Sequence, residues 1–341
     1  MKYDVTIGIP VYRSEPYIRR ALESALAQSY PSIEFLLVDD GGGDRSVQII
    51  EEIQASHPRG NDVRILSHRQ NLGVAASRNQ IIDEALGSYL YFMDSDDVIA
   101  EHTIEVLMQQ IQMHDAEIAF GSYEKIEITG ERVAYQYPSL LLLGEDKLAA
   151  FAYRKYAGIQ ASACNYLVST SLLRDHHHRF VDASYWEDMV FTFDLVTSVS
   201  RAVLLSDITY TYICRENSLS HYQARRQIPK EEVFRNVRMI DHLKATSSAL
   251  CHKAYFPDRC YCMMMTDFYI ACHILKRRKE MRPSVTSAEI RAIMAHPATM
   301  RQICAFPRRR GANLGLWLLG KLPPTACVAA IWTLGKVRKL I

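Results

Sequence analysis

The feature that most constrains this chain is an apolar run that ends abruptly in carboxylates. Residues 89–98 read Tyr-Leu-Tyr-Phe-Met-Asp-Ser-Asp-Asp-Val, which predicts a buried strand followed at once by Asp94, Asp96 and Asp97. In open α/β sheets, ligands bind at the carboxyl ends of the strands. Carboxylates crowded at that edge repel one another unless a positive group lies among them. A hard divalent cation shared with the phosphates of a nucleotide is the simplest such group.

Strands and helices alternate over residues 4–120. Apolar, β-branched runs predict strands at 4–10, 33–38, 63–66, 88–93 and 116–120. Apolar residues at helical spacing predict helices at 15–29, 44–56, 74–86 and 101–114. The alternation predicts right-handed βαβ units, and hence a Rossmann-like, mostly parallel sheet with helices on both faces.

The alternation breaks after residue 120. Two strand-like segments flank Thr129-Gly130 and predict an antiparallel hairpin over 123–137. Further elements are expected as helices at 145–155, 169–176 and 187–198 and as strands at 203–205 and 209–214. From Pro229 onward the pattern is mainly helical, with long stretches at 230–254 and 257–280. We therefore expect an α/β domain over 1–225, with halves at 1–120 and 121–225, and a mainly helical C-terminal region over 226–341.

Charge is unevenly distributed along the 341 residues. No acidic residue follows Glu289, whereas nine basic residues do. Subtracting these nine from the 40 lysines and arginines leaves 31 against 38 acidic residues, so residues 1–289 carry a formal charge of −7. An acidic body with a basic, apolar tail indicates an anionic membrane surface or an acidic partner, and we expect no nucleic-acid partner.

The tail over about 306–341 combines apolar residues, including Trp317 and Trp332, with basic ones. Its longest uncharged run, 322–335, has 14 residues, which is shorter than the roughly 20 that a spanning helix needs. Tryptophan with basic neighbours suits a helix in the interface of an anionic leaflet. The alternative is a C-terminal helix that packs on the body or forms a homodimer face. The N-terminus has no secretory signal, so we expect a cytoplasmic protein, peripheral on the inner face of the cell membrane.

The eight cysteines are scattered, and six of them lie between residues 251 and 327. Cys260 and Cys262 flank one residue and His252 is nearby in sequence, so a zinc site is one interpretation. Structural zinc sites usually contain CxxC pairs, which this sequence lacks. We expect reduced core thiols, as in a cytosolic protein.

Four short motifs fall at successive strand ends. They are Ile9-Pro10-Val11-Tyr12, Val38-Asp39-Asp40-Gly41-Gly42-Gly43-Asp44, Asn71-Leu72-Gly73-Val74-Ala75-Ala76-Ser77-Arg78-Asn79 and Asp94-Ser95-Asp96-Asp97. Taken singly, each is weak, because acidic pairs often cap helices and glycine runs often only form turns. The order and the spacing of all four together carry the weight.

In this order the motifs closely resemble those of the family 2 glycosyltransferases of the GT-A fold. Members have a Pro-Val-Tyr-like element, a Val-Asp-Asp-Gly-Ser-like element, an Asn-x-Gly-x-x-x-x-Arg-Asn element and an Asp-x-Asp at successive strand ends. The resemblance is strong over residues 3–120 and weaker to about 222. The one departure in the second motif is Gly42-Gly43, where serine or threonine is usual, and glycine there still turns and offers backbone N–H groups.

The resemblance implies a nucleotide-sugar site with a divalent metal, Mn²⁺ or Mg²⁺. Tyr12 would stack on the base, Asp40 would accept hydrogen bonds from a uracil-type edge, and Asp94 would hold the ribose or a metal-bound water. Asp96 would ligate the metal that bridges the diphosphate. Arg78 would contact the base, the phosphate or Asp94, with a structural ion pair as the alternative. The full set expected to bind the nucleotide is Pro10, Val11, Tyr12, Glu15, Asp40, Asn71, Arg78, Asp94 and Ser95.

A Glu-Asp pair at the start of a later helix also resembles an element of the family, and Glu187-Asp188 fits it. Sugar transfer needs a general base for the acceptor hydroxyl, and we expect Asp188 in that role, with Glu187 next in line. The alternative is two acids that stabilise a helix N-terminus. One carboxylate opposite the leaving group implies inversion, with no covalent sugar intermediate.

Residues 212–221 resemble a family loop that closes over the diphosphate. Arg215 and Ser218 would contact phosphate, and His221 would be a metal or phosphate ligand. The alternative is a solvated loop without a ligand.

These features together predict an inverting, metal-dependent hexosyltransferase with a nucleotide-diphospho-sugar donor, a UDP-sugar first. The resemblance implies an acceptor on a lipid-linked or growing bacterial surface polysaccharide. A nucleotidyltransferase is one rival, but it would want a Gly-rich, Arg- and Lys-containing loop after the first strand, and Tyr12-Arg13-Ser14-Glu15 is not that. A non-catalytic nucleotide-sugar- or lipid-binding protein is the other rival. Such a protein would tolerate loss of the acidic residues, whereas Asp40, Asp94, Asp96 and Asp188 are all present here.

Overall fold

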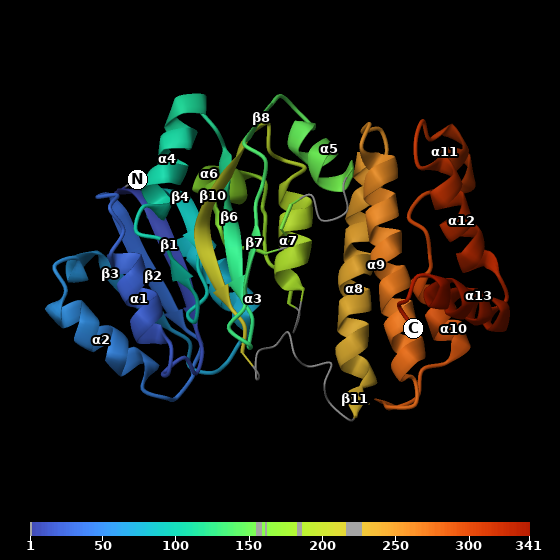
Figure 1. Cartoon of the computed structure of the whole chain (residues 1–341), viewed down its shortest axis with the longest axis horizontal. Coiled ribbons are helices and arrows are strands. Elements are labelled where there is room, and N and C mark those ends of the chain that lie inside the picture. Colours follow the sequence, from blue (N-terminus) through green and yellow to red (C-terminus); the bar gives the residue numbers. More distant parts are fainter. Residues whose placement is uncertain (1, 155–158, 161, 183–185, 216–226) are drawn as a thin grey trace. The chain divides into compact units, whose positions relative to one another are not determined.

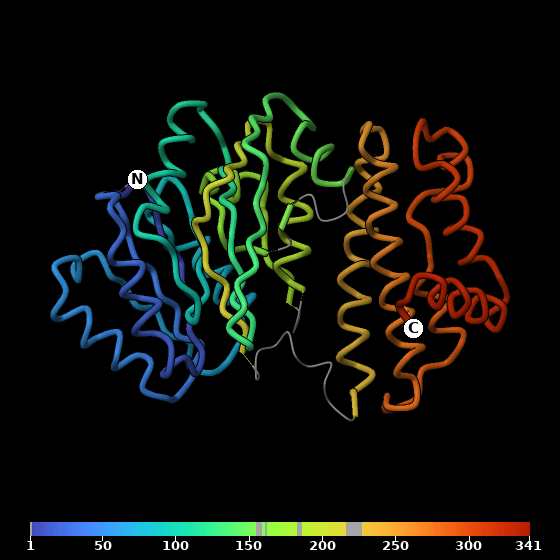
Figure 2. Tube along the Cα trace, in the orientation of Figure 1, coloured from blue at the N-terminus to red at the C-terminus, as the bar shows by residue number. Residues whose placement is uncertain are grey.

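The computed structural model of the chain describes residues 2–154, 159–160, 162–182, 186–215 and 227–341. Their contacts divide them into two compact units, which are described separately. The first holds the described residues of Met1–Leu148, Ala161–Asp182 and Glu187–Ser218, and the second those of Ala149–Gln160, Ala183–Trp186 and Leu219–Ile341. Figure 1 labels the elements, and Figure 2 traces the path of the chain.

The first unit is built on one sheet whose N-terminal half is parallel (Figure 1). Its order is β3 (Val63–Ser67), β2 (Ile33–Asp39), β1 (Tyr3–Val11) and β4 (Gly87–Phe92), and every neighbour in this half is parallel. The two central strands are buried on both faces, which is typical of parallel strands covered by helices. The predicted βαβ alternation is therefore confirmed here, with strand ends within two residues of the expected ones.

Beyond β4 the sheet is mixed. Short β9 (Tyr166–Ser169) lies antiparallel between β4 and β6 (Ile118–Ile126), and β10 (Arg201–Ile213) then runs parallel to β6. The predicted hairpin is the pairing of β6 with β7 (Arg132–Tyr135), while β5 (Val98–Ile99) and β8 (Leu140–Leu143) pair antiparallel with β10. Strand β10 is continuous where two short strands were expected, because an irregularity between Leu204 and Tyr210 interrupts its register without ending the pairing.

Helices flank this sheet. They are α1 (Ile18–Leu26), α2 (Ser46–Ser56), α3 (Val74–Glu84), α4 (Thr103–His114), α6 (Thr170–Asp175) and α7 (Glu187–Leu195). Helix α5 (Lys147–Arg154) begins in the first unit, and its residues from Ala149 on belong to the second. A short 3₁₀ turn, η1 (Gly60–Asp62), precedes β3. Helix α3 packs directly on β1, where Gly8 leaves the space that the Ile81 side chain fills. Helix α1 begins three residues later than the predicted start at Glu15, because a turn at Ser14 accepts hydrogen bonds from the backbone N–H groups of Tyr17 and Ile18.

The topology fixes where a ligand can bind. From β1 the chain crosses to β2 and β3 on one side, and from β3 it returns to β4 on the other side of β1. This reversal opens a crevice at the carboxyl ends of β1 and β4, which is where ligands bind in such sheets. The Asp94–Asp97 segment directly follows β4 at that edge.

The second unit is helical from residue 230 onward, as predicted. It contains α8 (Lys230–Thr246), η3 (Ser247–Leu250), α9 (Phe256–Arg277), α10 (Ser287–Ile293), α11 (Met300–Ala305), α12 (Arg310–Lys321) and α13 (Pro324–Val337), with a short parallel pairing of β11 (Ile228–Pro229) and β12 (Met281–Arg282). Helix α9 is buried along most of its length and packs against α8, α12 and α13. Among the described residues, no helix combines the length and the apolarity needed to span a bilayer.

Cys260 and Cys262 are buried free thiols of α9. Within the described ranges, the one group of acidic, histidine or cysteine side chains close enough to share a metal ion is Asp94, Asp96 and Asp97.

Candidate active site

The acidic cluster after β4 divides into two kinds of carboxylate. Ligand atoms of Asp94, Asp96 and Asp97 all lie within 4.8 Å of one another. Asp97 is buried, and it accepts hydrogen bonds from the Tyr210 hydroxyl at 2.8 Å and from the Ile213 N–H at 2.9 Å. Asp97 therefore ties the end of β4 to β10, while Asp94 and Asp96 remain partly exposed.

Crowding and burial change the acidity of the cluster. Burial and the nearby Asp94 carboxylate raise the pKa of Asp96 to about 6, although Arg215 opposes the rise. The same two causes raise the pKa of the more deeply buried Asp97 well above its usual value. The cluster therefore holds more negative charge than its surroundings stabilise, and a cation at its open side would relieve this repulsion.

Arg78 is the buried cation of the site. Its Nη2 donates to Asp94 Oδ1 at 2.9 Å, and its Nη1 donates to Glu187 Oε1 at 2.8 Å. Burial lowers the pKa of Arg78, but the surrounding anionic groups, Asp94 foremost, raise it by more, so the guanidinium stays charged. The arginine of the third motif thus joins the end of β4 to the first residue of α7.

Asp188 follows Glu187 in the first turn of α7 and is partly exposed. Its Oδ1 accepts a hydrogen bond from the Met189 N–H at 2.7 Å. Burial of the carboxyl group, with Glu187 beside it, raises the pKa of Asp188 to about 7, while Arg78 opposes the rise. A carboxylate with a pKa near neutrality is well matched to general-base work.

Arg215 lies directly after β10 and reaches the acidic cluster. Its Nη2 is 2.7 Å from Asp96 Oδ2 and also donates to the Asp96 carbonyl oxygen at 2.7 Å. Its guanidinium lies over the Tyr17 ring, 3.7 Å from the centroid. The predicted diphosphate arginine is therefore at the cluster, while Ser218 and His221 lie outside the described residues.

The residues of the first motif form a wall beside the cluster. Pro10 and Val11 are buried, and Tyr12 is exposed with the Arg13 guanidinium 5.3 Å from its ring centroid. The Ser95 hydroxyl is 2.6 Å from the Ser14 hydroxyl, which pins this segment to the acidic loop. Tyr12 is thus the aromatic face that a base could stack on at this edge.

Glu15 ties two loops together. Its backbone N–H donates to Asp44 Oδ2 at 3.0 Å, and its Oε2 accepts from the Arg45 N–H at 3.2 Å. This contact joins the segment after β1 to the glycine-rich segment after β2.

Asp40 is buried and shapes the third motif. Its two carboxylate oxygens accept hydrogen bonds from the Leu72 and Gly73 N–H groups, both at 2.8 Å. His68 Nδ1 lies 2.7 Å from Asp40 Oδ1. These bonds leave Asn71 exposed at the edge of the site. Recognition of a uracil edge by Asp40 stays a prediction.

Sequence reasoning missed several residues that build the site. The Tyr210 hydroxyl donates a hydrogen bond to Asp97. Asn79 forms two hydrogen bonds of 2.8 Å with the backbone of Phe180. Asn79 stands in the third motif, so its place beside Arg78 was a usable signal. Tyr210 looks like any aromatic strand residue, and only the pairing of β10 brings it to the cluster.

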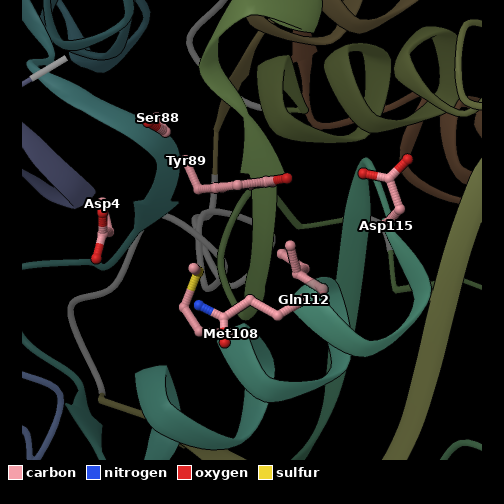
Figure 3. Close-up of a pocket in the computed structure, with 7 residues that line it drawn as sticks. Asp4, Ser88, Tyr89, Met108, Gln112 and Asp115 are labelled. Atoms are coloured by element: carbon pink, nitrogen blue, oxygen red, sulfur yellow. The ribbon is translucent and has the colours of Figure 1, made fainter.

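A separate cavity of about 270 Å³ lies near the amino ends of β1 and β4 (Figure 3). It is lined by Asp4, Ser88, Tyr89, Met108, Ile111, Gln112 and Asp115. Asp4 and Ser88 stand at the beginnings of β1 and β4, whereas the acidic cluster follows the end of β4. This cavity is therefore not the candidate active site.

The strand order, the helical cover and the acidic strand end define the class as an α/β transferase of the GT-A fold. Comparison with known proteins agrees. Residues 6–168 match the sequence model of the glycosyl transferase family 2. These residues belong to glycosyl transferase family 2, and the chain is a glycosyltransferase.

The similar proteins differ in how much of their length the chain covers. It is 26% identical to the glycosyltransferase GlyG of Streptococcus pneumoniae over 224 residues, which are 63% of this chain and 72% of GlyG. It is 24% identical over 213 residues to the teichoic acid poly(glycerol phosphate) polymerase of Staphylococcus epidermidis, covering 61% of this chain but 28% of that protein. The structure of S. aureus TarS 1-349 in complex with UDP-GlcNAc aligns with a TM-score of 0.64 at 20% identity, over 96% of this chain and 89% of the TarS 1-349 chain.

Proposed function

We propose that this enzyme transfers a sugar, with inversion, from a nucleotide-diphospho-sugar to a hydroxyl group of a bacterial surface polysaccharide. The observation that carries the proposal is the double ion pair of Arg78, with Asp94 at 2.9 Å and with Glu187 at 2.8 Å. Because one guanidinium holds both, the acids of the strand end and the Glu187-Asp188 pair belong to one site. The name of the teichoic acid polymerase and the UDP-GlcNAc in the TarS structure support the acceptor class and a UDP-sugar donor.

Asp188 is the general base in this proposal. It is partly exposed, its pKa is raised to about 7 by burial first and then by Glu187, and it stands in the first turn of α7. As a base it would accept the proton of the acceptor hydroxyl while that oxygen attacks the anomeric carbon. Glu187 is engaged by Arg78 and is less available for the same task. A single base with direct attack gives inversion.

The acidic cluster fits a Mn²⁺ or Mg²⁺ ion. Asp94 and Asp96 offer carboxylate oxygens, the ligand type that hard divalent cations prefer, whereas Asp97 is fully engaged by β10. Asp96 is the proposed ligand, with Asp94 as the nucleotide or water contact. When bound, the ion would neutralise charge on the departing nucleoside diphosphate. Arg215 pairs with Asp96 and, in this proposal, contacts a phosphate of the donor.

The second unit supports a proposal about location. Its last two helices carry exposed apolar side chains, Leu318, Trp332, Leu334 and Val337, beside exposed basic ones. We propose that residues 1–225 form the transferase domain and that the tail, about 306–341 of the helical region 226–341, lies on the anionic inner face of the cell membrane. An acceptor on a lipid carrier would then be within the enzyme's reach.

The test of the proposed function is donor turnover by the Asp188→Asn variant. Release of the nucleoside diphosphate is measured with a panel of UDP- and GDP-sugars and Mn²⁺, and UDP binding is followed by thermal shift. We expect turnover to fall by about 10² to 10⁴-fold, the usual contribution of a general base, with UDP binding retained. Unchanged turnover of every sugar nucleotide by Asp188→Asn would rule out Asp188 as the base.

A further inference from the structure

The surroundings of Arg78 leave it little room to act as a ligand contact. Its side chain is only 5% exposed, and both terminal nitrogens are engaged by carboxylates, Asp94 and Glu187. Its remaining nitrogen, Nε, is buried and has no hydrogen-bond partner among the described groups. A nucleotide phosphate would have to compete with two carboxylates for a guanidinium that is almost fully buried.

We propose that Arg78 and Glu187 are positioning residues that hold the start of α7 against the end of β4. They would thereby keep Asp188 close to Asp94, a carboxylate of the site proposed for the sugar nucleotide. This inference rests on the proposed role of Asp188 as the general base. It moves Arg78 from the nucleotide contacts to the scaffold of the site. It also removes Glu187 from the proton transfer itself.

A second contact from the same helix supports the inference. Asn79, the residue after Arg78, donates from Nδ2 to the Phe180 carbonyl and accepts from the Phe180 N–H, both at 2.8 Å. The Phe180 ring stacks on Phe191 of α7 with centroids 3.9 Å apart and meets Phe92 of β4 edge-on at 5.4 Å. Helix α3 therefore holds α7 at two points, through Glu187 in its first turn and through Phe191 one turn later.

The chain separation explains why two points are needed. Arg78 and Glu187 are 109 positions apart in the sequence. Among the described residues, the strands that pair with β4 are β1 and β9, so strand pairing does not fix α7 against β4. The position of Asp188 relative to Asp94 therefore depends on side chains. Misplacement of a catalytic group by about 1 Å can cost roughly 100-fold in rate.

The variants Glu187→Ala and Glu187→Gln separate positioning from direct chemistry. Glutamine keeps an oxygen that accepts from Arg78 Nη1, whereas alanine removes the contact. We expect kcat of Glu187→Ala to fall by about 100-fold, with the KM of UDP-GlcNAc, or of the sugar nucleotide that the wild type turns over, changed less than about threefold. Glutamine should restore most of kcat. Equal loss of kcat in both variants would make Glu187 a proton-transfer group and overturn the inference.

Arg78→Lys tests the other partner. Lysine keeps the charge but cannot hold two carboxylates in the same fork. A positioning role predicts a lower kcat with unchanged affinity for UDP and Mn²⁺ by thermal shift. A higher Kd for UDP with kcat unchanged would return Arg78 to the nucleotide contacts. Retained UDP binding also establishes that the variant is folded.

The pH profile gives a readout that a purely structural loss would not move. Glu187 raises and Arg78 lowers the pKa of Asp188, and Asp94 also faces it. The acid limb of kcat/KM should therefore shift to lower pH in Glu187→Gln and to higher pH in Arg78→Gln, with Arg78→Lys unshifted. Shifts in the same direction for the two glutamine variants would contradict the shared contact.

A matched control breaks another ion pair of the same helix. Asp83 of α3 pairs with Arg179 at 2.6 Å on the surface, and Asp83→Asn should leave kcat, KM and the pH profile unchanged. Failure of the inference is distinguishable from failure of the proposed function. If Asp188→Asn is inactive but Glu187→Ala matches the wild type, the base is right and the positioning pair is wrong. If Asp188→Asn is fully active, the base is wrong.

Discussion

The acidic edge of the first unit and the ion pairs of the second unit bury opposite charges. In the first, the Arg78 side chain is 5% exposed while its partner Asp94 is 35% exposed. In the second, Asp267 is 0% and Asp258 is 2% exposed, while their partners Lys244, Arg308 and Arg309 are 9%, 33% and 38% exposed. The acidic edge therefore presents a carboxylate to its surroundings, and the Asp258 cluster presents two guanidinium groups, whereas Lys244 and Asp267 are both buried.

This inversion indicates what each region can bind. Exposed carboxylates around a buried cation attract a metal ion, and exposed guanidinium groups over a buried acid attract anions. The formal charge is also uneven along the chain, with −7 over residues 1–289 and nine basic residues without an acid after Glu289. This difference agrees with the proposal of a metal and donor site in the first unit and of an anionic surface for the tail.

The sharpest way to break the comparison is to remove an exposed carboxylate of the acidic edge. In Asp96→Asn we expect turnover with Mn²⁺ to fall by about 10³-fold, or about 4 kcal/mol, because metal stabilisation of the leaving group is worth several kcal/mol. Nucleoside diphosphate release measures the turnover, and thermal shift measures the loss of Mn²⁺-dependent UDP binding.

Asp207→Asn is the matched control, since it removes an exposed acid of β10 outside the cluster. Its turnover should equal that of the wild type. If Asp96→Asn keeps its Mn²⁺ dependence, Asp96 is not the ligand and the acidic edge needs another explanation.

Removing one partner of a buried ion pair in the second unit should lower the stability of the protein and leave its turnover unchanged. Lys244 Nζ lies 2.5 Å from Asp267 Oδ2 and donates to the Ile293 carbonyl at 2.9 Å. In Lys244→Met the buried Asp267 loses its partner, and we expect the free energy of unfolding to fall by about 3 kcal/mol. Urea unfolding followed by tryptophan fluorescence measures it, since Trp317 and Trp332 lie in α12 and α13 of this unit.

Two further variants decide whether the buried charge is the cause. Lys244→Met with Asp267→Leu removes both charges, and its stability should return to within about 1 kcal/mol of the wild type. Asp241→Asn removes the exposed partner of Lys244 and should cost less than about 1 kcal/mol. A double variant as unstable as Lys244→Met would show that packing, and not the unpaired acid, is responsible.

In the first unit, the strands that are buried on both faces were predicted from the sequence, whereas two short strands were not. Strands β1 and β2 are apolar runs that are buried along most of their length, and the parallel arrangement of β1 to β4 follows from the βαβ alternation. Strand β9 has four residues and enters between β4 and β6 from a distant part of the chain. Its position depends on pairing partners that no local pattern specifies, so it was missed, as was the four-residue β8.

The site was predictable as a set of motifs but not as a set of contacts. Asp94, Asp96 and Asp188 carry recognisable neighbours in sequence. In the structure Arg78 joins Asp94 to Glu187, the residue before Asp188, while Asp96 pairs with Arg215. The pairing of Arg78 with Glu187 spans 109 positions and depends on how α3 and α7 meet. Asp40 illustrates the same limit, because its bonds to Leu72 and Gly73 arise only when two strand ends become neighbours.

Membrane binding sharpens the positive half of the comparison. Lys321 and Lys336 are exposed and lie over the rings of Trp317 and Trp332, at 5.2 and 5.1 Å. Each basic residue near an anionic surface contributes about 1 kcal/mol, so Lys321→Gln with Lys336→Gln should weaken binding to phosphatidylglycerol-containing vesicles by about 2 kcal/mol, roughly 30-fold. Vesicle co-sedimentation measures the change.

The control for this experiment changes two exposed lysines of the first unit, Lys2→Gln and Lys147→Gln, with the same change in net charge. Equal losses in the two double variants would indicate a general charge effect. If the wild type does not bind vesicles and sediments as a dimer whose formation depends on the two tail lysines, the tail is a homodimer face.

The last prediction concerns the pH dependence of stability. Burial raises the pKa of Asp267 to about 7, although Lys244 opposes the rise. A folded-state pKa above the ordinary value means that the native state binds more protons than the unfolded state between about pH 4 and pH 7. This contribution to stability is therefore complete below that window and is lost as the pH rises through it.

In Asp267→Asn the loss should disappear, so the unfolding free energies of wild type and variant should diverge by at most about 1.4 kcal/mol per pH unit. Urea unfolding at pH 5, 6, 7 and 8 measures the difference, in which the titration of all other groups cancels. A parallel pH dependence of the two proteins would mean that Asp267 stays ionised throughout, and that Lys244 stabilises a buried charge in the second unit as fully as Arg78 does in the first.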